Sequence, residues 1–89
     1  MNTEEILTVQ RPGKTQPFRQ CVVEAVSGYL QQIEEEQVCH LYRLVLSEME
    51  QPLLETVMRH VNGNQSQASQ LLGISRSTLR KKLSTYQIE

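Results

Sequence analysis

The chain has 89 residues, a net charge of −1 and 38% hydrophobic residues, with 4% aromatics and no Trp. A chain this short buries a limited share of its surface unless it associates, so we expect one small domain that pairs with a second copy. Apolar residues that are mainly Leu, Val, Ile and Met favour helices over strands. The composition therefore predicts an all-α fold, and the patterns described below predict four helices per chain.

Charge is distributed unevenly along the sequence. Residues 1–58 carry four bases and nine acids, whereas residues 59–89 carry five bases and one acid. A basic C-terminal segment on an otherwise acidic chain indicates a local site for a polyanion. The N-terminus has no signal-peptide pattern, and the chain has no apolar run of about 18 residues, so we expect a cytoplasmic protein without a membrane partner.

The first 16 residues are predicted to form an arm. A short apolar run, Ile6–Val9, precedes the turn signal Pro12-Gly13. A small hairpin and disorder both fit this pattern. Isolated two-stranded hairpins are marginal in water, which favours a flexible arm over residues 1–16.

Two helices are predicted over residues 17–61. Apolar residues recur every three or four positions from Pro17 to Ile33, and again from Val38 to Val61. The second pattern continues in phase past Pro52, which indicates one kinked helix rather than two. The remaining residues are too few to cover both apolar stripes. We therefore expect two chains to cover each other, with these two helices of both chains packed into one four-helix homodimer core.

Residues 62–89 have the pattern of a helix-turn-helix. Gly63 can end the preceding helix, and Asn64 is a suitable N-cap for a short helix that stops at the turn residue Gly73. Ser75 then caps the last helix. The small residues Ala68 and Ser69 would allow close helix approach. The apolar contacts beneath the pair are expected from Leu71, Leu72, Ile74, Leu79 and Leu83.

Arg76 is difficult to explain by structure alone. A cation in the first turn of a helix is disfavoured by the helix dipole by about 0.3 to 1 kcal/mol. A recognition helix, however, directs its first residues at base edges, where Arg can bind guanine through two hydrogen bonds. Further phosphate contacts are expected around the same helix from Thr78, Arg80, Lys81 and Lys82.

Other classes of function have less support. Cys21, Cys39, His40 and His60 stand at no metal-ligand spacing, and the chain has no Asp. We expect reduced thiols, no metal, no cofactor, no catalytic residue and no enzyme activity. The stacking aromatics of single-strand RNA modules are missing. The alternative that stays open is a dimeric interaction protein whose basic helix binds an acidic partner.

From about Pro17 to the C-terminus, the sequence resembles the family of the factor for inversion stimulation (Fis), bacterial nucleoid-associated proteins. The likeness rests on Leu-Tyr-Arg-Leu-Val-Leu-Ser-Glu-Met-Glu-Gln-Pro-Leu-Leu at 41–54, Gly-Asn-Gln at 63–65, Gly-Ile-Ser-Arg at 73–76 and Thr-Leu-Arg-Lys-Lys-Leu at 78–83. Enhancer-binding transcription activators end in a similar helix-turn-helix. The helix that contains Gln51-Pro52 favours the Fis family.

The resemblance implies a transcriptional regulator that binds and bends double-stranded DNA as an intertwined homodimer and reads little sequence directly. It places Ser75 and Arg76 at base edges. It places Asn64, Ser66, Thr78, Arg80, Lys81 and Lys82 on phosphates. RNA polymerase or a site-specific recombinase would be protein partners.

The sequence also departs from the family. The best-known member has a basic residue in place of Gln67 and two further lysines in place of Ser84 and Thr85. Weaker wrapping of flanking DNA is expected as a result. The arm is shorter than in relatives that activate DNA invertases, so that activity does not follow from the likeness.

Overall fold

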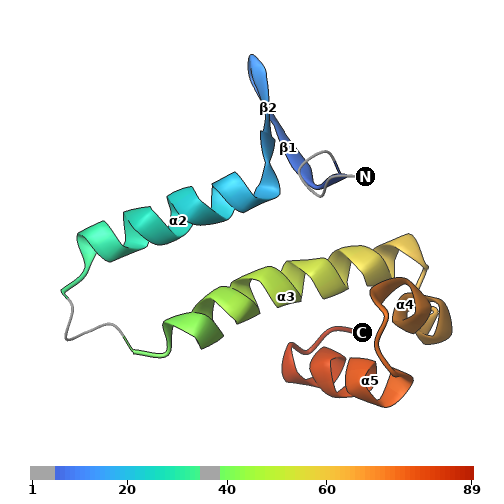
Figure 1. Cartoon of the computed structure of the whole chain (residues 1–89). Coiled ribbons are helices and arrows are strands. Elements are labelled where there is room, and N and C mark those ends of the chain that lie inside the picture. The colour runs from blue at the N-terminus through green and yellow to red at the C-terminus, as the bar shows by residue number, and fades with distance from the viewer. Residues whose placement is uncertain (1–5, 35–38) are drawn as a thin grey trace. The chain divides into compact units, whose positions relative to one another are not determined.

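The computed structural model describes residues 6–34 and 39–89. The chain divides into two compact units, with the boundary between Cys39 and His40. The first unit contains a β-hairpin and the helix α2, and the second contains the helices α3, α4 and α5 (Figure 1). The described part of the chain therefore has the four predicted helices. The hairpin corrects the all-α prediction.

The hairpin pairs β1 (Thr8–Arg11) with β2 (Lys14–Pro17) in antiparallel register. Its turn uses Gly13 at φ 82°, a conformation that glycine adopts without strain. The structure thus differs from the disorder favoured for this arm. The physical reason is that the hairpin does not stand alone: the Phe18 N–H donates to the Leu7 carbonyl at 2.8 Å. Residues 1–5 of the predicted arm lie outside the described residues.

Side chains also tie this hairpin to the helix that follows it. Gln16 is buried, and its Nε2 donates to Oε2 of Glu24 at 2.9 Å. Arg11 Nη2 donates to Sγ of Cys21 at 3.6 Å, and this hydrogen bond raises the pKa of Arg11 above its ordinary value. Cys21, like Cys39, is a free thiol.

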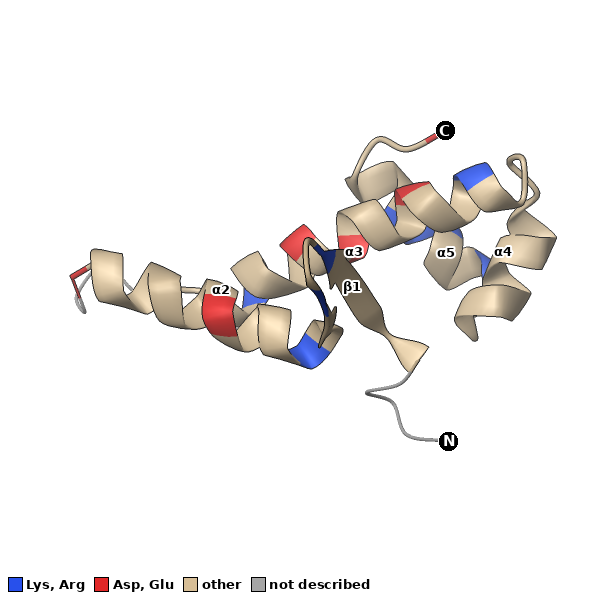
Figure 2. Ribbon diagram, turned by 90° about the horizontal axis from the view of Figure 1, so that it is seen from above, with Lys and Arg blue, Asp and Glu red and all other residues tan. Residues whose placement is uncertain are grey.

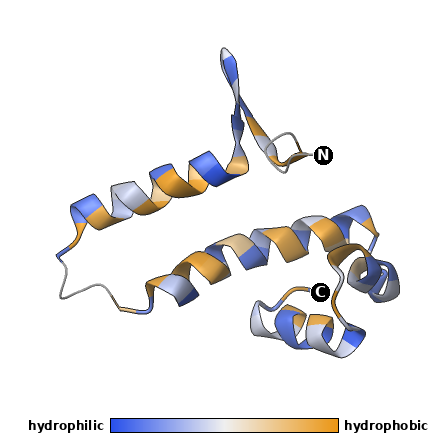
Figure 3. Cartoon of the chain, viewed as in Figure 1, coloured by the Kyte–Doolittle hydropathy of each residue, from blue (hydrophilic) through white to orange (hydrophobic). Residues whose placement is uncertain are grey.

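The helix α2 spans Phe18–Gln32, one residue inside the predicted start at Pro17, which serves as its N-cap. Proline suits the beginning of a helix because the first amide groups have no helical acceptor. None of the residues of α2 is buried in the single chain. The apolar positions of this helix, visible along its length in Figure 3, are exposed or half-buried.

The helix α3 spans Leu41–His60 and runs without a break through Pro52, which confirms a single helix there. The predicted start at Val38 lies outside the described residues, as do Glu35 and Glu36 of the acidic run. At its other end, the chain reverses through Gly63 at φ 83°, whose N–H donates to the Met58 carbonyl at 2.9 Å.

The core of the second unit lies where α3 meets α4 (Gln65–Leu72) and α5 (Arg76–Thr85). Leu54 of α3 and Leu79 of α5 are its largest fully buried side chains, with 2% and 0% exposure. Its other buried members are Met58, Val61, Ala68 and Leu83. These residues hold the two short helices against the end of α3, and this position fixes the candidate site.

Candidate nucleic-acid interface

The helix-turn-helix is defined by its caps, as the sequence predicts. Asn64 caps α4, with its Oδ1 accepting from the Gln67 N–H at 3.1 Å. Gly73 ends that helix at φ 76°, and its N–H donates to the Ser69 carbonyl. Ser75 caps α5, because its Oγ accepts from the Thr78 N–H at 3.2 Å. A turn of residues 73–75 thus joins an eight-residue helix to a ten-residue helix.

The small residues at the helix contact are buried as expected. Ala68 has 0% exposure, and Ser69 is buried with its Oγ donating to the Ser66 carbonyl at 2.9 Å. Leu71 differs from the prediction, because 62% of it is exposed. Residues two positions apart lie on opposite sides of a helix, so the burial of Ser69 turns Leu71 outward.

Three cations of α5 face solvent. Arg76, Arg80 and Lys81 are exposed, and their side chains make no hydrogen bond or ion pair with any residue that the structure describes. Figure 2 shows basic segments on α5, whereas acidic segments occur on α3. Basic side chains held on a helix, with no protein partner, can be directed at an anionic ligand.

Hydroxyl groups gather at the start of α5, a feature that sequence reasoning missed. Ser75 Oγ donates to Thr78 Oγ1 at 3.0 Å and lies 3.2 Å from Ser77 Oγ. The hydroxyl of Ser75 therefore already serves the helix cap and its neighbours. The spacing of Ser75, Ser77 and Thr78 in the first turn is the signal that indicates this cluster.

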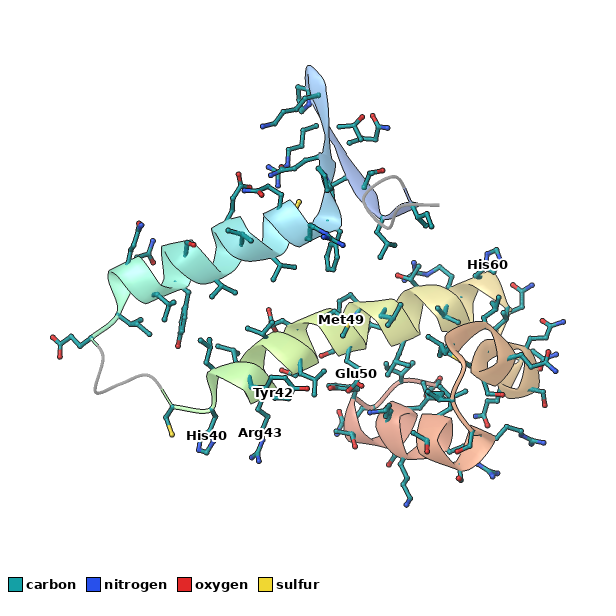
Figure 4. All side chains as sticks on the ribbon, viewed as in Figure 1. His40, Tyr42, Arg43, Met49, Glu50 and His60 are labelled. Carbon is teal, nitrogen blue, oxygen red and sulfur yellow. The ribbon has the colours of Figure 1, made fainter. Side chains whose placement is uncertain are left out.

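Lys82 differs from the other cations of α5, because it is paired within the chain. Its Nζ lies 2.7 Å from Oε2 of Glu50 on α3, and the Tyr86 hydroxyl donates to Oε1 of the same carboxylate at 2.7 Å. Figure 4 shows Glu50 on the side of α3 that faces α5. We call Glu50, Lys82 and Tyr86 the Glu50 clasp.

The contacts within the Glu50 clasp shift the pKa values of Glu50 and Tyr86. The Lys82 ammonium, followed by the Tyr86 hydroxyl, holds the pKa of Glu50 below its ordinary value of 4.5. The carboxylate in turn raises the pKa of Tyr86 above its ordinary value of 10.0. Glu50 stands one helical turn before buried Leu54, and this spacing could have indicated that it lies at the edge of the core.

The remaining surface offers little chemistry of other kinds. Over residues 6–34 and 39–89, no three His, Cys or carboxylate side chains gather as metal ligands would. Within the same ranges, no helix has the length and apolar character required to cross a membrane.

The caps, the buried contact and the solvent-facing cations define a helix-turn-helix protein with a basic second helix. The family described as "Bacterial regulatory protein, Fis family" matches residues 45–86. The DNA-binding protein Fis of Glaesserella parasuis is 45% identical over 84 residues, covering 94% of this chain and 86% of the relative. Those of Vibrio cholerae and Vibrio vulnificus are 45% identical over 89 residues, covering 94% and 91%. The chain belongs to the Fis family, a family of DNA-binding regulatory proteins and not of enzymes.

Proposed function

We propose that this Fis-family protein binds duplex DNA as a homodimer, bends it and regulates transcription on the bacterial nucleoid. The observation that carries the proposal is the placement of Arg76. It occupies the first position of α5 and is exposed, one turn before Leu79 and two turns before Leu83, the residues that fix this helix in the core. A cation in that position opposes the helix dipole but suits a guanine edge in the major groove.

Phosphate contacts are proposed around Arg76. Arg80 and Lys81 are exposed on the same helix and would neutralise phosphates beside the groove. Ser66 and Asn64 stand at the start of α4, where backbone N–H groups favour an anion. The oxygen of Asn64 is used by its cap, so its amide NH₂ group is the part available to a phosphate.

Ser75 and Thr78 complete the proposed DNA-contacting set from the start of α5. Ser75 would lie beside Arg76 at the base edges, and Thr78 would lie at a phosphate. Their mutual hydrogen bond holds both hydroxyls in place before DNA arrives. Lys82, which the resemblance also places on a phosphate, is treated separately below because its ammonium is paired with Glu50.

The homodimer is supported by a second apolar face of α3. Tyr42, Met49 and Leu53 are spaced by seven and four residues, so they share one side of the helix. All three are exposed in the single chain, Tyr42 by 81%, and Figure 4 labels Tyr42 and Met49. The core of the second unit uses a different side, through Leu54 and Met58. A second copy would cover this face together with α2.

Bending follows from the family resemblance. In dimers of that kind the two recognition helices are closer than one DNA turn, about 34 Å, so the duplex must curve to meet both. Gln67, Ser84 and Thr85 are uncharged and exposed. We expect them to wrap flanking DNA less strongly than lysines would. RNA polymerase and a site-specific recombinase stay predictions as protein partners.

A mobility-shift series at rising salt tests the function. Binding to an AT-centred duplex should weaken steeply with salt, because each phosphate contact contributes about 0.9 to the slope of log K against log salt. Arg76→Ala should reduce discrimination between a preferred and a random duplex by roughly tenfold. Arg43→Ala is the matched control, since Arg43 is an exposed arginine on the first turn of α3, the end remote from α4 (Figure 4). A flat salt response, or equal effects of both substitutions, would contradict the proposal.

A further inference from the structure

The position of Lys82 on α5 differs from that of its neighbour Lys81. Leu79, Lys82, Leu83 and Tyr86 are spaced by three, four and seven residues, which places them on one face of the helix. Leu79 and Leu83 are buried, and Lys82 and Tyr86 are half-buried beside them. Lys81 is exposed. Lys82 therefore lies at the margin of the face that packs on α3.

Both oxygens of the Glu50 carboxylate are occupied by α5. Oε2 receives Lys82 and Oε1 receives Tyr86, each at 2.7 Å. The Glu50 side chain is 15% exposed and that of Lys82 is 34% exposed. A pair partly withdrawn from water is screened less than a surface pair. Moving Lys82 to a phosphate would leave the carboxylate with one donor.

We propose that Lys82 is a positioning residue, which acts through Glu50 to fix the orientation of α5, and that it does not bind a phosphate. The turn at residues 73–75 holds the first end of α5, and the Glu50 clasp holds its last turn against α3. The helix is ten residues long, about 15 Å. With both ends held, its tilt and rotation are set, and so are the directions of Arg76 and Lys81. The proposal rests on the DNA-binding function above.

The salt dependence of DNA binding separates the two roles of Lys82. If Lys82 neutralised one phosphate in each protomer of the proposed dimer, removal of its charge would lower the slope by about 1.8. Lys82→Met keeps the apolar stem and removes the charge. We expect its slope to equal that of the unmodified protein, whereas Lys81→Met, the matched lysine, should lower the slope by about 1.8. A slope lowered equally by both substitutions would overturn the proposal.

Glu50→Gln should affect DNA binding differently if Lys82 binds a phosphate than if Lys82 orients α5. If Lys82 binds phosphate, this substitution frees it and removes a nearby acid, so DNA binding should strengthen. If the Glu50 clasp orients α5, discrimination between preferred and random duplexes should fall roughly threefold to tenfold, as for Lys82→Met, and the double variant should be no worse than either single one. Glu48→Gln, an exposed acid of the same helix, controls for the change of charge.

Discrimination is the decisive measurement, because loss of folded protein alone weakens binding to every duplex by the same factor. Unchanged discrimination in both variants would overturn the proposal. If Glu50→Gln fails to fold, Tyr86→Phe removes a single hydrogen bond from the Glu50 clasp and should lower discrimination in the same direction by a smaller factor.

Hydrogen exchange in the free protein keeps the inference separate from the proposed function. Glu50→Gln should speed exchange in the last turn of α5 severalfold while α4 is unchanged. A protein that binds no DNA but shows this change would sink the proposed function and leave the Glu50 clasp standing. Unchanged exchange in α5 would show that the clasp does not hold the helix.

Discussion

The two units of this chain achieve order in different ways. Residues 40–89 bury Leu54, Met58 and Leu79 in a core of their own. Helix caps and the Glu50 clasp add hydrogen bonds and an ion pair around that core. In the other unit, Gln16 of the hairpin is buried, but α2 buries none of its residues. A 15-residue helix has little stability without a packed face. The unit of residues 40–89 therefore has the packed core that it needs to be stable by itself, whereas α2 depends on what covers it.

The largest expected effect is on the core of residues 40–89. Leu79→Ala should lower the free energy of unfolding by about 2 to 5 kcal/mol, because it removes buried methyl groups and leaves a cavity. Leu71→Ala is the matched control: the same atoms are removed from a side chain that is 62% exposed, and the decrease should stay below about 1 kcal/mol. Urea unfolding followed by circular dichroism measures both. Similar decreases in the free energy of unfolding for the two variants would show that Leu79 does not belong to the core and Leu71 to the surface.

The second prediction targets the face that α3 would share with a partner. Met49→Glu places a charge in the proposed dimer contact and should raise the dimer dissociation constant at least about tenfold, or about 1.4 kcal/mol. Amide protection in α2 should fall with it, while α5 keeps its protection. Light scattering and hydrogen exchange provide the measurements.

Gln51→Glu is the matched control for that experiment, since it adds the same charge at an exposed polar position of α3. Its dimer should remain intact. If α5 loses protection together with α2 in Met49→Glu, the contrast between the two units is wrong.

The elements that were predicted well are those set by local chemistry. Asn64, Gly73 and Ser75 determine where α4 and α5 begin and end, because capping depends on a few neighbouring residues. The hairpin was harder, since its stability comes from bonds to the helix that follows. Leu71 and the Glu50 clasp depend on which sides of the helices meet. Tertiary packing determines which sides meet, and the periodic pattern of apolar residues alone does not specify it.

A third, smaller effect tests one of those local determinants. Asn64→Ala should cost about 1 kcal/mol, because the Gln67 N–H loses its acceptor at the start of α4. Gln67→Ala leaves that backbone donor in place and removes an exposed side chain, so its cost should stay within about 0.5 kcal/mol. Thermal unfolding measures the difference between the two variants. Equal costs would mean that the cap adds nothing to the stability of residues 40–89.

The smallest expected effect is the pH dependence of the Glu50 clasp. Because the folded protein lowers the pKa of Glu50 below 4.5, the unfolded chain binds more protons between the two values. The stabilisation is therefore complete above about pH 4.5 and is lost as the pH falls through the lowered pKa. A partly exposed pair of this kind contributes under about 1 kcal/mol.

Unfolding free energies of the unmodified protein and Glu50→Gln should differ at pH 7 and converge as the pH falls through the lowered pKa of Glu50. Glu48→Gln accounts for the general effect of removing an acid from α3. The same convergence should persist in Met49→Glu protein, because the Glu50 clasp lies wholly within residues 40–89 and needs no partner. A gap that vanishes when the dimer dissociates would instead make the clasp a consequence of dimerisation, and residues 40–89 would no longer be the self-sufficient part of the chain.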